Sequence, residues 1–353
     1  MKKVAVIGSV GLPASYGGFE TLVENIIDRK IEFTVYCSGK HYQKRYKKYK
    51  GAFLVYVPIK ANGISSIFYD VFSILHAIFN GHKTILVLGY PAAILFPIIR
   101  LLKPSLKIVT NIDGMEWKRA KWKKFASIYL RFSERLAVKF SQIVISDNKV
   151  ISDYVKKKYG VICKTIPYGG DHAFLKNSTL KKNVFLQNKK PFAFALSRIE
   201  PENNSHLILD AFKKSSLQLV YIGNWQASEY GINLKKDFKN FENIKMLDPI
   251  FDKEELFKYR YLCSFYLHGH SAGGTNPSLV EMMHFAKPII AFDCSFNRET
   301  LQNKGNYFNT VESLESLIKN IDHLFDGEEL RKIARERYTW EKIRKQYIEI
   351  VTS

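Results

Sequence analysis

Residues 264–291 read SFYLHGHSAGGTNPSLVEMMHFAKPIIA. An apolar run at 264–267 is typical of a buried strand, and a glycine-containing loop follows it. The segment Pro277–Phe285 then predicts a helix with proline at its first position. A second apolar run at 288–291 completes the order strand, helix, strand. This order predicts a βαβ unit with parallel strands.

The same alternation extends outward in both directions and restarts near residue 190. Two blocks of this kind predict an α/β protein of two Rossmann-like, doubly wound parallel sheets, with ligands bound in a cleft at the carboxyl ends of the strands. Predicted strands are 4–8, 33–37, 53–57, 85–88, 107–111, 142–146, 192–196, 217–222 and 244–247, and predicted helices are 19–27, 64–79, 205–213, 253–259 and 340–350.

The length of 353 residues also favours two domains. We expect an N-terminal domain at 1–175, a C-terminal domain at 176–335 and a terminal helical segment at 336–353. The polar stretch 175–190 is the predicted linker.

Charge is unevenly distributed along the chain. Residues 1–175 hold 28 Lys and Arg against 11 Asp and Glu, whereas 176–353 hold 26 against 22. The basic N-terminal half indicates an anionic partner: a membrane surface, a phosphorylated substrate or nucleic acid. The stretches 41–50 and 117–125 mix cations with aromatic residues, which suits a membrane interface, a single-stranded nucleic acid or a merely solvated face.

The four cysteines are far apart and form no C-x-x-C pair, so neither a zinc motif nor a disulfide framework is predicted. The longest apolar stretch, 84–99, is too short to span a bilayer. We therefore expect a cytoplasmic protein whose contact with the inner face of the cell membrane is peripheral.

Two candidate positions lie in the first block. Gly17 and Gly18 follow the first predicted strand, where glycine lets backbone N–H groups approach a phosphate. A plain strand-to-helix turn is an equally good interpretation. Asp113 follows the strand at 107–111, so its carboxylate could bind a sugar hydroxyl or accept a proton. The alternative is a turn made by Asp113 before Gly114.

The second block carries two more motifs. Gly273 and Gly274 precede the helix that begins at Pro277, where free N–H groups predict an anion site, and Glu281 could accept hydrogen bonds from a ribose diol. Arg198 could bond two diphosphate oxygens, or pair with a nearby glutamate such as Glu200.

No Asp-x-Asp motif occurs in the chain. We therefore expect no metal, with arginine and backbone N–H groups meeting the charge of a leaving diphosphate.

Taken together, residues 16–21, 113–119, 198–204 and 268–281 resemble the motifs of GT-B glycosyltransferases of family 4. The likeness is greatest to the bacterial rhamnosyltransferase group of capsule and cell-wall polysaccharide assembly, and it covers essentially the whole chain. It implies that the terminal helix crosses back to the N-terminal domain, which would bind the acceptor. The donor-binding set that it implies is Gly17, Gly18, Arg198, Asn204, Ile250, His270, Gly273, Gly274, Thr275, Asn276, Ser278, Leu279 and Glu281, and Asp113 and Arg198 are the predicted catalytic residues.

Two positions depart from the broad family. Its donor-sugar glutamate is replaced here by Gly273, and its lysine beside the diphosphate by Asn203. Both departures fit the rhamnosyl group, and they place more of the diphosphate charge on Arg198.

The resemblance implies a retaining, metal-independent transfer of L-rhamnose from dTDP-L-rhamnose to a lipid-pyrophosphate-linked saccharide. The nucleotide sugar is a co-substrate, so no cofactor is expected. The expected partners are this donor, the lipid-linked acceptor and an anionic membrane surface, but not nucleic acid. Alternatives are a UDP- or GDP-sugar donor on the same fold, a GT-B epimerase and a nucleic-acid-binding protein.

Overall fold

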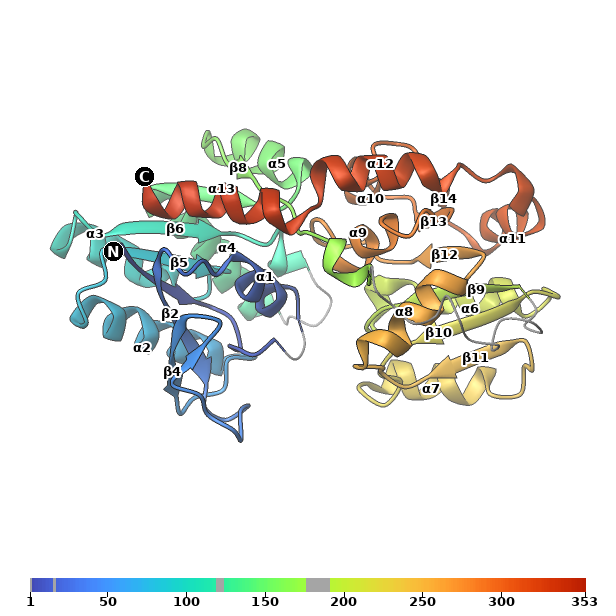
Figure 1. Ribbon diagram of the computed structural model, residues 1–353, viewed down its shortest axis with the longest axis horizontal. Coiled ribbons are helices and arrows are strands. Elements are labelled where there is room, and N and C mark those ends of the chain that lie inside the picture. The colour runs from blue at the N-terminus through green and yellow to red at the C-terminus, as the bar shows by residue number, and fades with distance from the viewer. Residues whose placement is uncertain (1, 15–16, 119–123, 176–190) are drawn as a thin grey trace. The chain divides into compact units, whose positions relative to one another are not determined.

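The computed structural model describes residues 2–14, 17–118, 124–175 and 191–353. Tyr16, most of the predicted linker and part of the second basic stretch lie outside the described residues. The chain divides into two compact units, the first formed by Met1–Tyr168 with Trp340–Ser353 and the second by Gly169–Thr339 (Figure 1).

The first unit is built on an eight-stranded sheet of order β3-β4-β2-β1-β5-β6-β7-β8 among the described residues. All neighbours pair in parallel except β3 with β4. The strands are β1 (Lys3–Ile7), β2 (Glu32–Ser38), β3 (Lys48–Tyr49), β4 (Ala52–Val57), β5 (Thr84–Leu88), β6 (Lys107–Asn111), β7 (Ile143–Ser146) and β8 (Lys164–Thr165).

Helices cover both faces of this sheet. The helix α1 leads from β1 to β2 and packs against α13, while α2 leads back from β4 to β5 and so lies on the opposite face. The helices are α1 (Gly18–Ile26), α2 (Ser65–Phe79), α3 (Phe96–Leu102), α4 (Lys124–Phe140), α5 (Lys149–Tyr159) and α13 (Trp340–Thr352), with short 3₁₀ turns η1 (Ala93–Leu95) and η2 (Glu116–Lys118).

The terminal helix α13 is part of the first unit. Its Tyr347 hydroxyl accepts a hydrogen bond from the Asn111 side chain at 2.8 Å, at the end of β6. Arg344 donates to the backbone carbonyl of Asn25 at the end of α1. These bonds tie the last residues of the chain to the first sheet.

The second unit has a six-stranded parallel sheet of order β11-β10-β9-β12-β13-β14 among the described residues. Its strands are β9 (Phe192–Leu196), β10 (Gln218–Ile222), β11 (Ile244–Leu247), β12 (Phe265–His268), β13 (Ile289–Phe292) and β14 (Asn306–Phe308). Its helices are α6 (Ser205–Phe212), α7 (Glu229–Phe238), α8 (Lys253–Leu262), α9 (Pro277–Met283), α10 (Ser295–Thr300), α11 (Val311–Lys319) and α12 (Gly327–Arg337), with 3₁₀ turns η3 (Asp171–Ala173), η6 (Pro201–Asn203) and η7 (Ile321–His323).

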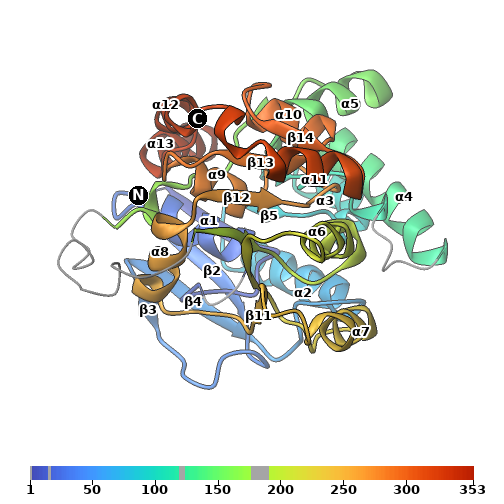
Figure 2. The same ribbon diagram turned by 90° about the vertical axis from the view of Figure 1, so that its right-hand side faces the viewer.

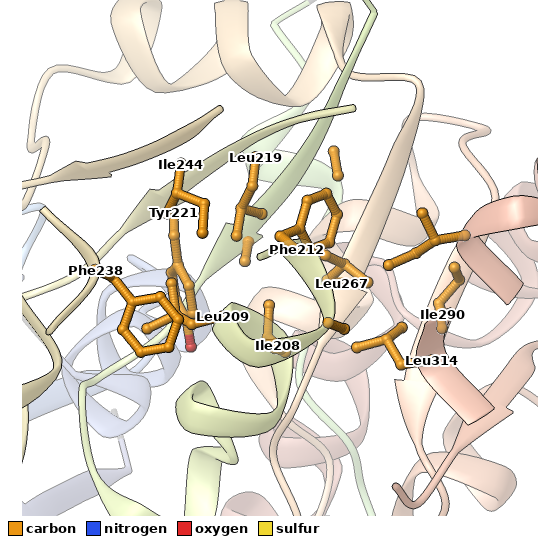
Figure 3. Close-up of a cluster of buried hydrophobic side chains, with 14 of the residues drawn as sticks. Ile208, Leu209, Phe212, Leu219, Tyr221, Phe238, Ile244, Leu267, Ile290 and Leu314 are labelled. Atoms are coloured by element: carbon orange, nitrogen blue, oxygen red, sulfur yellow. The ribbon is translucent and has the colours of Figure 1, made fainter. Parts of the chain in front are cut away.

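Apolar side chains between this sheet and the helices on one of its faces form the core shown in Figure 3. Phe212 of α6, Leu267 of β12 and Leu314 of α11 are almost fully buried in it. This packing fixes the strand ends from which the candidate loops leave. The predicted fold class, with two parallel Rossmann-like sheets, is confirmed. No helix among the described residues is long and apolar enough to cross a membrane.

Candidate functional site

Two loops of the second unit lie side by side because the strands that they follow are neighbours. Residues 197–204 leave the carboxyl end of β9, and 269–276 leave that of β12, to which β9 is paired. In parallel α/β sheets ligands bind at this edge. The structure therefore brings the Arg198 motif and the glycine-rich motif to one place.

Hydrogen bonds fasten the two loops together. The backbone N–H and the hydroxyl of Ser271 both donate to the carbonyl of Glu202 at 2.9 Å. The Asn204 amide donates to the carbonyl of Gly269 at 2.8 Å, and His270 Nδ1 lies 2.7 Å from Asn203 Oδ1. Asn204 and His270, both predicted to bind the donor, thus have structural partners in these loops.

Gly269 shows how closely the loops approach. A Cβ at this position would lie 2.0 Å from the carbonyl oxygen of Asn203, a separation that real atoms do not tolerate. A residue with a side chain at 269 would force the loops apart, so glycine is required there.

The N–H groups at the start of α9 already have acceptors, whereas, among the described residues, two of the loop before it do not. In the first turn of α9, Ser278 N–H bonds the side chain of Asn276, and the N–H groups of Leu279 and Val280 bond its carbonyl. Within the part of the chain that the structure describes, the N–H groups of Gly273 and Gly274 have no hydrogen-bond acceptor. The available donors therefore belong to the loop rather than to the helix start.

The remaining predicted positions around α9 have different surroundings. Leu279 is fully buried, so its side chain is not available to a ligand, and Thr275 is also buried. Ser278 Oγ lies 2.8 Å from Asn276 Oδ1 and accepts from the hydroxyl of Tyr266. Ile250 is half-buried just beyond the end of β11, at the same edge of the sheet.

Arg198 is half-exposed at the start of its loop. Its guanidinium lies 3.5 Å from the Glu200 carboxylate, the ion pair that the sequence offered as an alternative. The Asn203 side chain donates to the Arg198 carbonyl at 2.9 Å and so fixes the backbone from which the guanidinium extends. An ion pair this exposed contributes little free energy. A diphosphate that takes the place of Glu200 beside Arg198 would therefore lose little stabilisation.

Glu281 is held by two residues that the sequence analysis missed. Its carboxylate accepts from the buried Arg260 of α8 and lies 3.3 Å from His172 Nε2 of η3. Burial acts to raise the pKa of Glu281, but Arg260 and then His172 outweigh it, and the pKa is lowered. Arg260 lies on the same side of α8 as the buried Phe257, three residues earlier, and this spacing was the available signal.

His268 lies at the end of β12 and is fully enclosed. Burial lowers its pKa to about 3, and its Nε2 has no hydrogen-bond partner among the described residues. Over those same residues, no cluster of three or more His, Cys, Asp or Glu residues could hold a metal ion.

The first unit contains the three remaining predicted site residues, Gly17, Gly18 and Asp113. Gly17 has a φ of 120°, and a Cβ there would lie 2.0 Å from a carboxylate oxygen of Glu20. The other Glu20 oxygen accepts from the Val10 N–H at 2.6 Å, and burial raises the pKa of Glu20. The positive φ of Gly17 and the nearby Glu20 carboxylate explain why residue 17 is glycine without invoking a ligand. Gly18 is the first residue of α1. Contact of either glycine with donor phosphates stays a prediction.

Asp113 lies just beyond β6 in a left-handed conformation, with a φ of 46°. Its N–H bonds the Asn111 side chain at 3.1 Å, so Asn111 forms an Asx turn at this position. The Tyr168 hydroxyl lies 3.4 Å from the Asp113 carboxylate, and burial raises the pKa of Tyr168. The half-buried carboxylate is thus placed at a strand end of the first unit.

Comparison with known proteins gives a family match for each half of the chain. Residues 176–339 match the family described as glycosyl transferases group 1, and residues 1–171 match a domain of unknown function, DUF1972. No curated protein matches the sequence.

Solved structures match over the full length. Sucrose-phosphate synthase from Thermosynechococcus elongatus has a TM-score of 0.81 at 12% identity, covering 99% of this chain and 98% of that one. HepE from Anabaena, in complex with UDP and glucose, has a TM-score of 0.74 at 15% identity and full coverage of both chains. The catalytic domain of starch synthase IV from Arabidopsis thaliana has a TM-score of 0.70 at 13% identity, covering 100% and 99%. Residues 176–339 are therefore similar to group 1 glycosyltransferases, residues 1–171 are similar to DUF1972, and the whole chain shares the GT-B fold of these solved structures.

Proposed function

We propose that this chain is a glycosyltransferase that moves L-rhamnose from dTDP-L-rhamnose to a lipid-pyrophosphate-linked saccharide, with retention of configuration and without a metal. The second unit would bind the donor, and the first unit would bind the acceptor at the inner face of the cell membrane. The observation that carries the donor site is the pair of joined loops after β9 and β12. They offer the Arg198 guanidinium and the N–H groups of Gly273 and Gly274 at one sheet edge.

The chemistry of the reaction explains why these groups would matter. As the glycosidic bond to the donor breaks, negative charge develops on the leaving diphosphate. A fixed guanidinium and two backbone N–H groups would stabilise that charge without a cation. Glu281, kept ionised by Arg260, would accept hydrogen bonds from the ribose hydroxyls. Asp113 would bind or deprotonate an acceptor hydroxyl.

A UDP-sugar donor is the second candidate, because HepE, which shares the fold, was solved with UDP-glucose. A thermal-shift panel of dTDP, UDP, GDP and their sugar conjugates, without metal, distinguishes the donors because a bound ligand raises the melting temperature. We expect the largest shift with dTDP-L-rhamnose.

Arg198→Ala should abolish most of that shift. Arg331→Ala is the matched control, since Arg331 forms an ion pair with Glu328 on α12. A panel in which no nucleotide changes the melting temperature at millimolar concentration would contradict the proposed donor site. Equal thermal shifts in wild type and Arg198→Ala would show that Arg198 does not contribute to the donor site.

A further inference from the structure

Three helices of the first unit turn apolar side chains away from the protein. In α2 and its preceding residue these side chains recur every three or four positions and so form one stripe along the helix. Phe68 is 63% exposed and Phe79 is 85% exposed. The opposite side of α2, which faces the sheet, buries polar Asp70 and Ser73. The stripe consists of Ile64, Phe68, Phe72, Leu75 and Phe79.

The neighbouring helices repeat this arrangement. At α3 the exposed apolar residues include Leu101, at 81%, and at α4 they include Phe125, at 87%. The right-handed crossovers that precede β5, β6 and β7 place α2, α3 and α4 on one face of the sheet, opposite α1 and α13 (Figure 2). The second and third stripes consist of Ile94, Ile98, Leu101 and Leu102, and of Phe125, Ile128 and Phe132.

Such a concentration of exposed apolar side chains is unusual for a protein surface that contacts only water. Of the 19 large apolar side chains that are exposed among the described residues, 12 belong to these three stripes. Large exposed apolar patches mark contacts with a partner or a membrane. We call the exposed side of α2, α3 and α4 the apolar face.

The exposed charged side chains of the three helices that form the apolar face are of one sign. Residues 65–79, 96–102 and 124–140, all described, contain two carboxylates, Asp70 and Glu134, and both are buried. The carboxylate of Glu134 accepts from Trp117, Tyr154, Tyr159 and Lys158, so it is not presented to a partner. The face therefore offers apolar groups and cations without an exposed carboxylate of its own.

A hollow of about 650 Å³ beside Phe132 gathers four of the cations. It is lined by Arg131, Arg135 and Lys139 of α4 and by Lys158 of α5. Adjacent α5 adds one exposed carboxylate, Asp153, which pairs with Lys149. Cations next to exposed aromatic and aliphatic side chains match the phosphate and acyl layers of an anionic bilayer.

We propose that the apolar face docks on an anionic lipid bilayer. The stripes on α2, α3 and α4 enter the boundary between headgroups and acyl chains, and Arg131, Arg135 and Lys139 of α4 bind lipid phosphates. This deepens the proposed function, because it names the surface through which the first unit reaches a lipid-linked acceptor.

Co-sedimentation of the full chain with vesicles tests the docking. The vesicles are phosphatidylcholine alone, or phosphatidylcholine with 30% phosphatidylglycerol, a composition chosen at roughly the anionic content needed for a clear surface potential. Wild type should bind the anionic vesicles, bind the neutral ones weakly, and lose affinity as salt is raised.

The double variant Phe68→Ser/Phe79→Ser should lower vesicle affinity by at least about tenfold, because each phenylalanine loses its transfer into the apolar layer. Both side chains are exposed, so the fold should tolerate the change. The matched control Ile232→Ser/Phe325→Ser removes two exposed apolar side chains from the second unit and should bind as wild type. The triple variant Arg131→Gln/Arg135→Gln/Lys139→Gln should lose most of the salt dependence.

Equal binding by wild type and Phe68→Ser/Phe79→Ser, or no binding by wild type, would overturn the docking. So would a wild-type dimer that Phe68→Ser/Phe79→Ser makes monomeric without any vesicle binding, since the face would then join two copies of the chain. The nucleotide thermal shift, measured without vesicles, reports the donor site alone. Failure of the docking and failure of the proposed transferase function are therefore distinguishable.

Discussion

Replacing Glu281 by glutamine should destabilise the second unit by leaving a buried cation without its counter-ion. Arg260 is 6% exposed, and the side chain of Glu281 is 13% exposed, so solvent can stabilise neither charge well. Removing one partner of a buried ion pair typically costs about 3–5 kcal/mol. Because glutamine can still accept a hydrogen bond from Arg260, we expect about 3 kcal/mol, near the lower limit.

The direction of the pH dependence follows from the lowered pKa of Glu281. A carboxyl group whose pKa is lower in the folded than in the unfolded state stabilises the protein above its unfolded pKa. That contribution is lost as the pH falls through the folded pKa. The stability gap between wild type and Glu281→Gln should therefore be full at pH 7 and shrink in acid.

Urea unfolding with separate transitions for the two units measures the effect, because a chain of two units need not unfold in one step. The double variant Arg260→Met/Glu281→Gln provides the control. With the unpaired charge removed, it should be at least as stable as Glu281→Gln. A cost below about 1 kcal/mol for Glu281→Gln, or additive effects in the double variant, would refute a coupled buried pair.

Three further outcomes are expected. Gly269→Ala should abolish the nucleotide-dependent thermal shift, since its Cβ would overlap the Asn203 carbonyl, whereas Gly160→Asn at the left-handed end of α5 should leave the shift intact. Tyr347→Phe should cost about 1–3 kcal/mol in urea unfolding of the first unit, because the buried Asn111 amide loses its acceptor. Asp70→Asn should stabilise the first unit at pH 8 and lose this advantage toward pH 4. Burial raises the pKa of Asp70, so wild-type stability falls as the pH rises above the unfolded value. An unchanged urea midpoint for Asp70→Asn at pH 8 would contradict that account.

Strands were the elements that the sequence predicted best. Central parallel strands are buried on both faces, so β5 and β9 read as continuous apolar runs and lie within one residue of the predicted ranges. The helix predicted at 64–79 was also found, as α2. Periodicity reveals that a helix has an apolar stripe but not whether that stripe faces the sheet or the surroundings. The outward stripe of α2 therefore required the structure.

Contacts between segments that are distant in the sequence are the part of the candidate site that could not be predicted. The strand-loop-helix order of residues 192–212 and 265–283 was predictable, and so was the placement of their loops at strand ends. The bonds between Ser271 and Glu202, and between Asn204 and Gly269, join segments more than sixty residues apart. The pairing of Glu281 with Arg260 likewise depends on where α8 packs against α9, which local patterns do not encode.

The proposed donor binding and the proposed membrane docking depend on different residues, so substitutions should affect them separately. The donor loops are fixed by hydrogen bonds within the second unit, and none of those bonds involves a residue of the apolar face. The apolar face lies wholly within the first unit, and its exposed phenylalanines support no buried core. Substituting them should leave the nucleotide shift unchanged, and Arg198→Ala should leave vesicle binding unchanged. If transfer to a soluble acceptor analogue survives Phe68→Ser/Phe79→Ser while transfer to a lipid-linked acceptor falls, the bilayer contributes by delivering the acceptor, and the chemistry belongs to the loops after β9 and β12.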